Sequence, residues 1–160
     1  MKYSLFIVIC FIYLNAYSKS SDSLLCSKIT YQYDQFEHTK NYDTPMGLSS
    51  GYTISFQKVI HKGISTYYLY LSNGDVSPIF DRGVIILLAN NHRINKPLTK
   101  VSSSVISYGY SVSALVTLNT NDIALLKKYS ITNFRLYIGD LKVDDGDKYK
   151  TLFNCLVTKK

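Results

Sequence analysis

Alternating apolar positions are clearest between residues 107 and 139, and the rest of the predicted fold is organised around this stretch. Five apolar residues there stand at every second position, the period of a strand with one buried face: Tyr108, Tyr110, Val112, Ala114 and Val116. The polar run 119–122 can cap a short helix, which we predict over residues 121–129. Phe134, Leu136 and Ile138 then predict a second strand, which Gly139-Asp140 ends.

The same alternation predicts three earlier strands, over residues 29–33, 52–60 and 65–72. His61-Lys62-Gly63 is the expected turn between the second and third of them. Asn73-Gly74 is a strong hairpin signal, since both central positions of a two-residue turn favour left-handed backbone. Its expected partner strand, Val76 to Phe80, contains Pro78 and therefore belongs at an edge or a bulge.

Turn signals and polar stretches divide the middle of the chain. Asp81-Arg82-Gly83 is read as a turn, and the continuous apolar run 84–89 predicts a strand covered on both faces. After a turn at Asn90-Asn91, residues 92–98 are expected to return as a strand that Pro97 interrupts. The polar stretch 34–48 is expected to be a loop or an irregular edge, and the serine-rich stretch 99–105 leads into the organising strand.

The last part of the chain predicts a helix over residues 147–158. Four apolar residues there follow the i, i+3, i+4, i+7 spacing of one helix face: Tyr149, Leu152, Phe153 and Leu156. The whole pattern predicts an α+β fold, with a mainly antiparallel twisted sheet of about six to eight strands built of hairpins and two short helices on one face or end. A β-sandwich with helical trimmings is the alternative.

Residues 1–18 read as a secretory signal peptide. Lys2 supplies the positive start, residues 5–14 are apolar, and residues 16–18 provide small side chains at the cleavage spacing. The apolar run is too short to span a bilayer, and Cys10 lacks the small preceding residues of a lipoprotein cysteine. We expect cleavage after Ser18, which leaves residues 19–160 as a single secreted or periplasmic bacterial domain.

Two cysteines then remain, Cys26 and Cys155. In an exported protein such a pair favours a disulfide, and two cysteines alone cannot complete a tetrahedral zinc site. The alternative is that Cys155 is a small buried hydrophobic residue on its helix.

Charge and tyrosine content suggest a binding surface without defining one. Cleavage removes only Lys2 among the charged residues, which leaves 17 basic and 11 acidic side chains and a formal charge of +6. The lysines are scattered rather than grouped in a block, so we expect a basic, soluble surface and no specific nucleic-acid partner. Twelve tyrosines remain and could line a face for a protein or glycan. The alternation of Tyr31 with Tyr33 and of Tyr108 with Tyr110 instead favours a place in the strand core.

The strongest local cluster of polar side chains is formed by Asp34, Glu37 and His38. It could hold a metal or serve proton transfer in a small exported hydrolase, but no second histidine lies nearby at a ligand spacing and the stretch reads as a loop. His61 and His92 stand beside predicted turns. The acidic run 144–147 lacks the glutamate that a calcium loop needs, so capping and solubility explain it better.

No nucleophile elbow, glycine-rich phosphate loop or reactive-cysteine context occurs in the chain. We therefore assign no catalytic, cofactor or metal-binding residue. The leading hypothesis is a non-enzymatic interaction or cell-envelope accessory module that meets a protein or glycan. The hydrolase using His38 with Asp34 or Glu37 is the alternative.

Two segments carry a resemblance to a family. Tyr33-Asp34 to Phe36 with Thr39 and Tyr42, and the run from Asp122 through Phe134 to Leu136, resemble small exported proteins of Bacteroidetes that have no assigned function. The resemblance implies an exported α+β domain in which a short helix leads into a strand bearing Arg135. It implies no catalytic residue.

Overall fold

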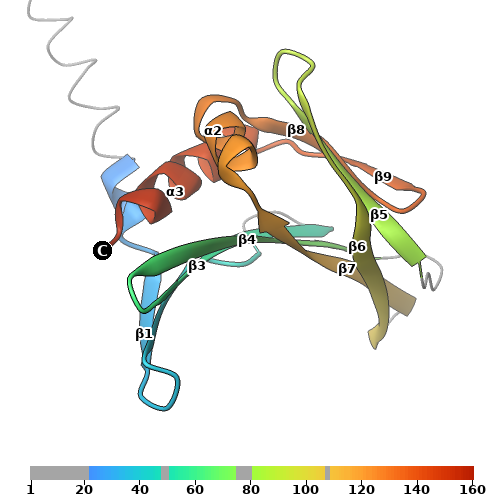
Figure 1. Ribbon diagram of the computed structural model, residues 1–160. Coiled ribbons are helices and arrows are strands. Elements are labelled where there is room, and N and C mark those ends of the chain that lie inside the picture. Colours follow the sequence, from blue (N-terminus) through green and yellow to red (C-terminus); the bar gives the residue numbers. More distant parts are fainter. Residues whose placement is uncertain (1–21, 48–50, 75–80, 107–108) are drawn as a thin grey trace, which may run out of the picture.

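A computed structural model describes residues 22–47, 51–74, 81–106 and 109–160, and in these residues the chain forms one sheet of nine antiparallel strands with short helices (Figure 1). The strands are β1 (Thr30–Asp34), β2 (Thr39–Asp43), β3 (Tyr52–His61), β4 (Ile64–Asn73), β5 (Asp81–Leu88), β6 (Arg93–Ile106), β7 (Gly109–Leu118), β8 (Ile131–Leu136) and β9 (Gly139–Lys142). The helices are α2 (Thr120–Lys128) and α3 (Gly146–Thr158), and residues 22–26 are also helical. Along the sheet the strands follow the order β1-β2-β3-β4-β7-β6-β5-β8-β9. The mainly antiparallel α+β class predicted from the sequence is confirmed.

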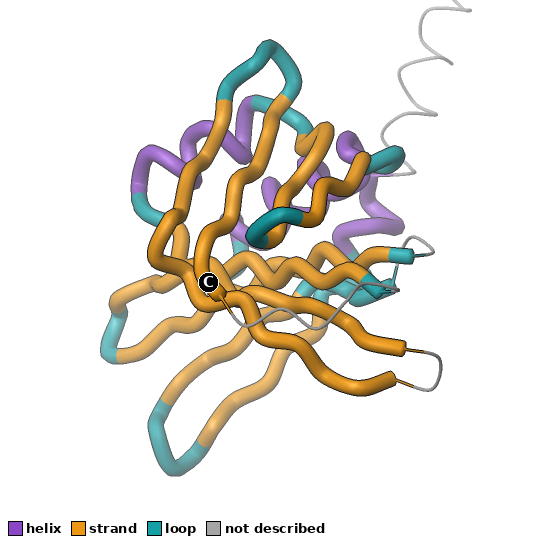
Figure 2. The backbone as a smooth tube through the Cα atoms, turned by 90° about the vertical axis from the view of Figure 1, so that its right-hand side faces the viewer, coloured by secondary structure: helices purple, strands orange, loops and turns teal. Residues whose placement is uncertain are grey.

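The sheet bends around the two helices. Both helices lie inside the bend, on one side of the sheet (Figure 1). Figure 2 shows the same arrangement turned by 90°. Helix α3 packs on both β3 and β8, although four strands lie between these two in the sheet. Five strand spacings correspond to about 24 Å along a flat sheet, yet the rings of Tyr52 on β3 and Phe134 on β8 are 6.1 Å apart. The bend therefore brings distant strands together.

The core lies between the helices and the concave face of the sheet. The predicted apolar face of α3 is confirmed, since Tyr149, Leu152, Phe153 and Leu156 are all at most 1% exposed. The ring of Phe153 lies 4.7 Å from that of Phe56 on β3. Burying large aromatic and aliphatic side chains of this kind is the main stabilising contribution to such a fold.

Helix α2 begins as its sequence predicts. The Asn119 side chain accepts a hydrogen bond from the Asp122 N–H at 2.9 Å, and the Asp122 carboxylate accepts one from the Asn119 N–H at 2.9 Å. This reciprocal capping box satisfies two of the N–H groups that a helix start leaves unpaired. At the other end Lys127 and Lys128 occupy the last turn, where a cation suits the helix dipole.

A buried lysine holds the C-terminal end of α3. Lys58 on β3 is only 5% exposed, and its ammonium donates to the backbone oxygens of Val157 at 3.2 Å and Lys159 at 2.5 Å. The ring of Tyr67 lies 5.4 Å below the same nitrogen. Lys58 thus satisfies orphan carbonyl groups and meets the negative end of the helix dipole, which compensates for its burial.

Three polar segments form strands, although their sequences predict loops or turns. The stretch 34–48, expected to be a loop or irregular edge, contains β2, which pairs with β1 and β3 along its whole length. The strand predicted to run through Ile138 to Gly139-Asp140 ends at Leu136 as β8, and Gly139 starts β9. Residues 93–106 form one long strand that passes through Pro97 and the serine-rich stretch. Backbone pairing with neighbouring strands overrides a low local propensity in each case.

The expectations for residues 81–91 need two corrections. Asp81-Arg82-Gly83 is not a turn: β5 starts at Asp81, and the register shifts between Arg82 and Val84. The run that follows is not covered on both faces, because Leu87 is 41% exposed while Val84, Ile86 and Leu88 are buried. The predicted turn at Asn90-Asn91 is confirmed by the positive φ angles of both residues, 74° and 65°.

The sheet forks between β6 and β7. These strands pair only from Val101 opposite Ala114 to Ile106 opposite Gly109. Beyond that point β7 continues to Leu118 beside β4, whereas β6 follows β5. A bulge accompanies the divergence, since Gly83 alone stands opposite residues 97–99 of β6. Pro97 lies in this bulge, which is where a residue lacking an N–H group is tolerated.

Several expectations fall outside the described residues. They are the signal peptide with Cys10, the partner strand Val76–Phe80 and the position of Tyr108. Among the residues that the structure describes, no helix is both long and apolar enough to cross a membrane.

Candidate interaction surfaces

The cluster of Asp34, Glu37 and His38 forms the turn between β1 and β2. The Asp34 carboxylate accepts hydrogen bonds from the backbone N–H groups of Phe36 at 2.8 Å and Glu37 at 3.1 Å, which makes it the side chain that closes the turn. The His38 ring nitrogen Nδ1 lies 3.1 Å from the hydroxyl of Tyr33, and His38 has a φ of 51°. These contacts give each member of the cluster a local role in the hairpin.

Two histidines share one end of the sheet and the third lies apart. His61 stands opposite Thr39 in the β2–β3 ladder, and its Nδ1 is 3.0 Å from the backbone oxygen of Glu37. His38 and His61 thus lie at neighbouring turns, so the three histidines are not all dispersed over the sheet. His92 lies beside Tyr129, with the ring centroids 5.1 Å apart. The contact of Glu37 with His61 is made by the backbone carbonyl oxygen of Glu37. A backbone carbonyl oxygen cannot serve as a general base.

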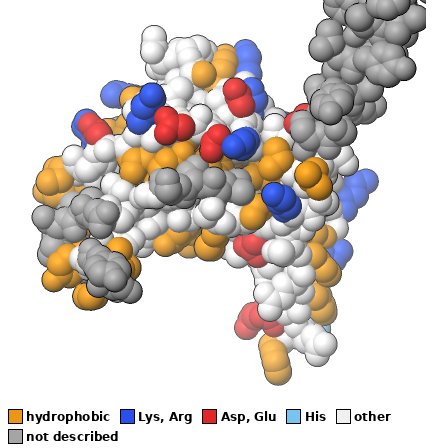
Figure 3. Space-filling view, turned by 180° about the vertical axis from the view of Figure 1, so that it is seen from behind, with side chains coloured by type: hydrophobic (Ala, Val, Ile, Leu, Met, Phe, Trp, Pro, Cys, Tyr) orange, Lys and Arg blue, Asp and Glu red, His pale blue; other side chains and the backbone are white. Residues whose placement is uncertain are grey.

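The hairpin of β1 and β2 projects from the body of the molecule as an arm. The arm is visible at the lower left of Figure 1 and carries hydrophobic side chains along one side and at its end in the space-filling view (Figure 3). Tyr31 is 56% exposed, Tyr33 46% and Phe36 96%. Lys40 stands opposite Tyr33 in the ladder and is also exposed. We call Tyr31, Tyr33, Phe36 and Lys40 the arm surface.

The arm surface corrects the assignment of these tyrosines to the core. Tyr31 and Tyr33 alternate as residues of a one-sided strand do, but both side chains stay largely exposed. Tyr110 is likewise 38% exposed. Tyr42, directly opposite Tyr31, is buried, and the two rings lie 5.0 Å apart. Alternation therefore identified the strand correctly but could not tell which tyrosines find a covering element.

Cys26 and Cys155 are joined through their Sγ atoms, with 5.6 Å between their Cα atoms. That separation falls in the usual range for a disulfide. The bond connects the segment before β1 to the last turns of α3 across 129 positions of the chain. It therefore fixes the base of the arm to the helix in the core.

The acidic run 144–147 is engaged by hydrogen bonds and lysines. Asp147 accepts a hydrogen bond from the Ser130 hydroxyl at 2.5 Å and pairs with Lys150 at 3.1 Å, and both contacts lower the pKa of its carboxyl group. Asp145 takes the N-cap position of α3 without a side-chain cap hydrogen bond and pairs with Lys148 at 2.7 Å. Among the described residues, no group of three or more potential ligands is arranged to hold a metal ion.

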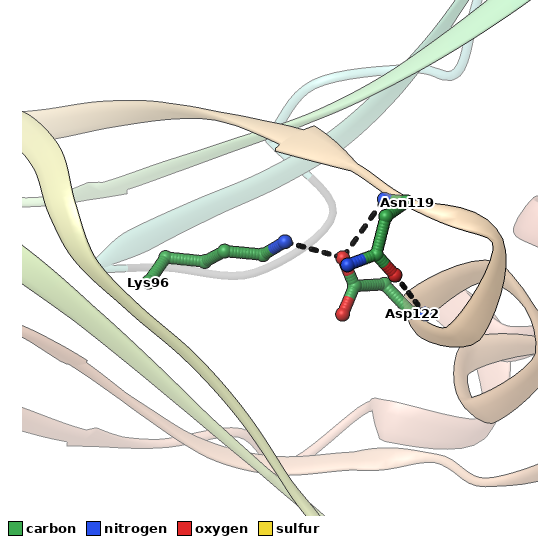
Figure 4. Close-up of polar contacts among 3 residues, drawn as sticks. All are labelled: Lys96, Asn119 and Asp122. Carbon is green, nitrogen blue, oxygen red and sulfur yellow. Dashed lines mark hydrogen bonds and ion pairs between the residues drawn. The ribbon is translucent and has the colours of Figure 1, made fainter.

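An ion pair bridges the fork between β6 and β7. Lys96 of β6 reaches across to the capping residue Asp122 of α2, where its ammonium lies 2.5 Å from Oδ2 (Figure 4). The Lys96 side chain is 19% exposed and that of Asp122 is 7% exposed. One carboxylate thus serves the helix cap at Asn119 and the ion pair together. Sequence reasoning found the cap but missed Lys96, because nothing local in the sequence links residues 26 positions apart.

A groove of about 740 Å³ opens where the two strands diverge. It runs over β4, β6 and β7, and Figure 4 shows the two diverging strands with the Lys96 side chain between them. The groove is lined by Tyr70, Asn95, Lys96, Pro97, Leu98, Thr99, Lys100, Ser102, Ser113, Ala114, Leu115 and Thr117. We call it the fork groove. Pro97 was the one sequence signal that pointed to an irregularity there.

No family model, curated protein or solved structure matches the chain. The resemblance of the two segments to small exported proteins therefore stays an expectation.

Proposed function

We propose that the protein is an exported, non-enzymatic interaction module of the bacterial cell envelope that binds a protein or glycan through the arm surface. The observation that carries this proposal is the exposure of Tyr31, Tyr33 and Phe36 on one projecting hairpin. Exposed apolar patches often mark interaction sites, and tyrosine combines apolar area with a polar group. Lys40 adds a cation beside the rings.

The test is binding to isolated cell envelopes of the native host. A variant with Tyr31, Tyr33 and Phe36 all changed to serine is expected to lose most of the binding, because it removes the exposed ring area. Ile138→Ser is the matched control, since Ile138 is 71% exposed but lies beyond β8, away from the arm. Protease or periodate treatment of the envelopes separates a protein partner from a glycan. Equal binding by the triple variant and the control would contradict the proposal.

The competing hypothesis is a hydrolase that uses His38 with Asp34 or Glu37 for catalysis. It predicts turnover of ester, peptide or glycoside substrates that is lost in His38→Ala. A screen that finds such activity in the wild-type chain, and none in the variant, would replace the interaction module by the enzyme.

Export is part of the same proposal. The apolar segment 5–14 and the cleavage pattern before residue 19 support it, and a Cys26–Cys155 disulfide is compatible with an oxidising compartment. The N-terminal residue of protein recovered from the native host provides the test. Lys19 is expected there, and an intact Met1 would contradict export.

We also propose that the nine strands form a single twisted sheet rather than a β-sandwich of two packed sheets. The continuous ladder from β1 to β9 supports this choice, because the strands on either side of the fork remain paired through six residues of β6 and six of β7. Protection of those amides from hydrogen exchange, equal to that of the β3–β4 ladder, is the expected result.

A further inference from the structure

We propose that the fork groove binds an extended peptide segment of a partner protein, which pairs through backbone hydrogen bonds with residues 115–118 of β7 and places an acidic side chain beside Lys100. This site is separate from the arm surface and does not depend on it.

Residues 115–118 of β7 form an open strand edge. On one side they pair with Tyr67–Tyr70 of β4, but on the other side the ladder with β6 has ended at Ala114. Every second residue of a strand directs its N–H and C=O groups to the same neighbour, so two of these four residues present both groups to the groove. An edge of this kind is a template for the addition of a strand.

The opposite wall of the groove is a poorer template. Residues 97–99 of β6 bulge opposite Gly83, and Pro97 has no N–H group to donate. We therefore place the peptide antiparallel to β7, in the position that a regular continuation of β6 would have taken. The bulge that diverts β6 is what leaves this position open.

The side chains of the groove suit an extended peptide with small or β-branched residues. Tyr70 and Leu115 stand opposite one another in the β4–β7 ladder and provide an apolar patch on its floor. Leu115 is 55% exposed, and Leu98 on the bulge is 78% exposed. Ser102, Ser113 and Thr117 are short, which leaves room for the side chains that alternate along a strand.

The charges of the groove favour an acidic residue on the peptide. The twelve lining residues include two lysines and no aspartate or glutamate. Lys96 is already held by Asp122, whereas Lys100 is exposed at the groove. A carboxylate placed near Lys100 gains a favourable charge interaction, while a basic peptide residue there is repelled.

The test starts from a random octapeptide library displayed on phage and panned against the purified mature chain. Enriched peptides are resynthesised, and amide hydrogen exchange of the protein is measured with each of them. We expect sequences that alternate β-branched residues and carry one aspartate or glutamate, and new protection confined to residues 115–118. Methylating the peptide nitrogens that pair with β7 is expected to weaken binding by about threefold to tenfold for each lost hydrogen bond.

Two substitutions and one control locate the site on the protein. Leu115→Asp and Lys100→Glu each place a carboxylate in the groove at an exposed position, so the fold is retained while the acidic peptides bind at least about tenfold more weakly. Ile64→Asp is the matched control: Ile64 is 71% exposed at the β3–β4 turn, and the substitution is expected to leave binding unchanged.

Three results would overturn the proposal. The first is a panning experiment whose enriched peptides bind Leu115→Asp as well as the wild type. The second is protection that falls on the outer edges β1 or β9 instead of on residues 115–118. The third is a concentration-dependent dimer of the free protein that Leu115→Asp disrupts, since the occupant would then be a second copy of the chain. Loss of arm binding in the triple serine variant has no bearing on these outcomes, so the two proposals fail separately.

Discussion

Single side chains that serve two structural purposes are the most sensitive points of this molecule. Asp122 holds the capping box of α2 and pairs with Lys96 at 2.5 Å, with both side chains largely removed from solvent. Removing one partner of such a pair leaves an unpaired charge in a poorly solvated place. Asp122→Ala is therefore expected to lower the free energy of unfolding by about 3 kcal/mol or more, the sum of a lost cap and an orphaned cation.

Urea denaturation measures this effect, and a double-mutant cycle identifies its source. Lys96→Met combined with Asp122→Asn removes both charges and is expected to cost less than the two single substitutions added together. Additive costs would mean that the ion pair contributes nothing beyond the two separate side chains.

Asp43 at the end of β2 makes stability depend on pH in the unusual direction. Burial raises the pKa of its carboxyl group above the ordinary 3.8, against a hydrogen bond from Gln57 that acts to lower it. A raised pKa in the folded state means that ionisation opposes folding, so this contribution to stability falls as the pH rises through the carboxyl range. Asp43→Asn is then expected to raise the melting temperature at neutral pH.

The gain from Asp43→Asn should disappear in acid, because the protonated aspartic acid and asparagine carry the same charge. Melting curves from about pH 3 to pH 7 check this, with the difference between the two proteins growing as the pH rises. A constant difference across that range would mean that the amide acts through the Gln57 contact rather than through charge.

At the scale of elements, the contact of α3 with β8 depends on one glycine. Gly146 starts α3 and is buried, and a Cβ there would collide with the backbone carbonyl oxygen of Ile131. Because neither backbone can give way easily, Gly146→Ala is expected to destabilise the fold by about 2–3 kcal/mol. Gly139→Ala is the matched control, since its Cβ would meet nothing closer than 3.7 Å. Similar denaturation midpoints for both variants would contradict this account.

Sequence patterns predicted the strands and helices whose own residues show a clear periodicity or a capping motif. The β3–β4 hairpin, the strand containing Val112 to Val116, the cap of α2 and the apolar face of α3 all follow from local periodicity and capping residues. β2 and β9 were missed because their residues are mostly polar, and both form by pairing with a neighbouring strand. Local propensity says little about a strand whose stability comes from its partner.

The candidate surfaces were harder to predict than the strands. That Tyr31 and Tyr33 are exposed depends on where the helices pack, which the period of the strand does not encode. The fork depends on β6 leaving β7 to follow β5, a choice between partners that lie far apart in the sequence. Lys96 and Lys58 have contacts 26 and about 100 positions away, so their roles become visible only in three dimensions.

At the scale of the whole molecule, the disulfide is expected to be a major part of the stability. On the chain-entropy model a bond across 129 positions stabilises the fold by about 4–5 kcal/mol. Replacing Cys26 and Cys155 together by serine should lower the melting temperature markedly, whereas Cys10→Ser should leave the mature protein unchanged.

Intact mass after alkylation without reductant decides whether the bond forms in the protein isolated from an oxidising compartment. We expect no alkylated thiol before reduction and two after it. Two alkylated thiols before reduction would instead support the alternative of a free, buried Cys155.

The bend of the sheet around α3 also determines when the chain can fold. Some core contacts of β3 are made with residues far along the chain: Phe56 and Phe153 are 97 positions apart, and Tyr52 and Phe134 are 82 positions apart. These contacts form late in folding, because a large loop must close before any of them stabilises the chain. A nascent chain that stops before residue 146 has only the short helix α2 to cover the concave face of its sheet, so we expect it to stay sensitive to protease. The protein should therefore complete its structure only after synthesis of α3. If the chain is exported as proposed above, this delay keeps it unfolded during transport across the membrane.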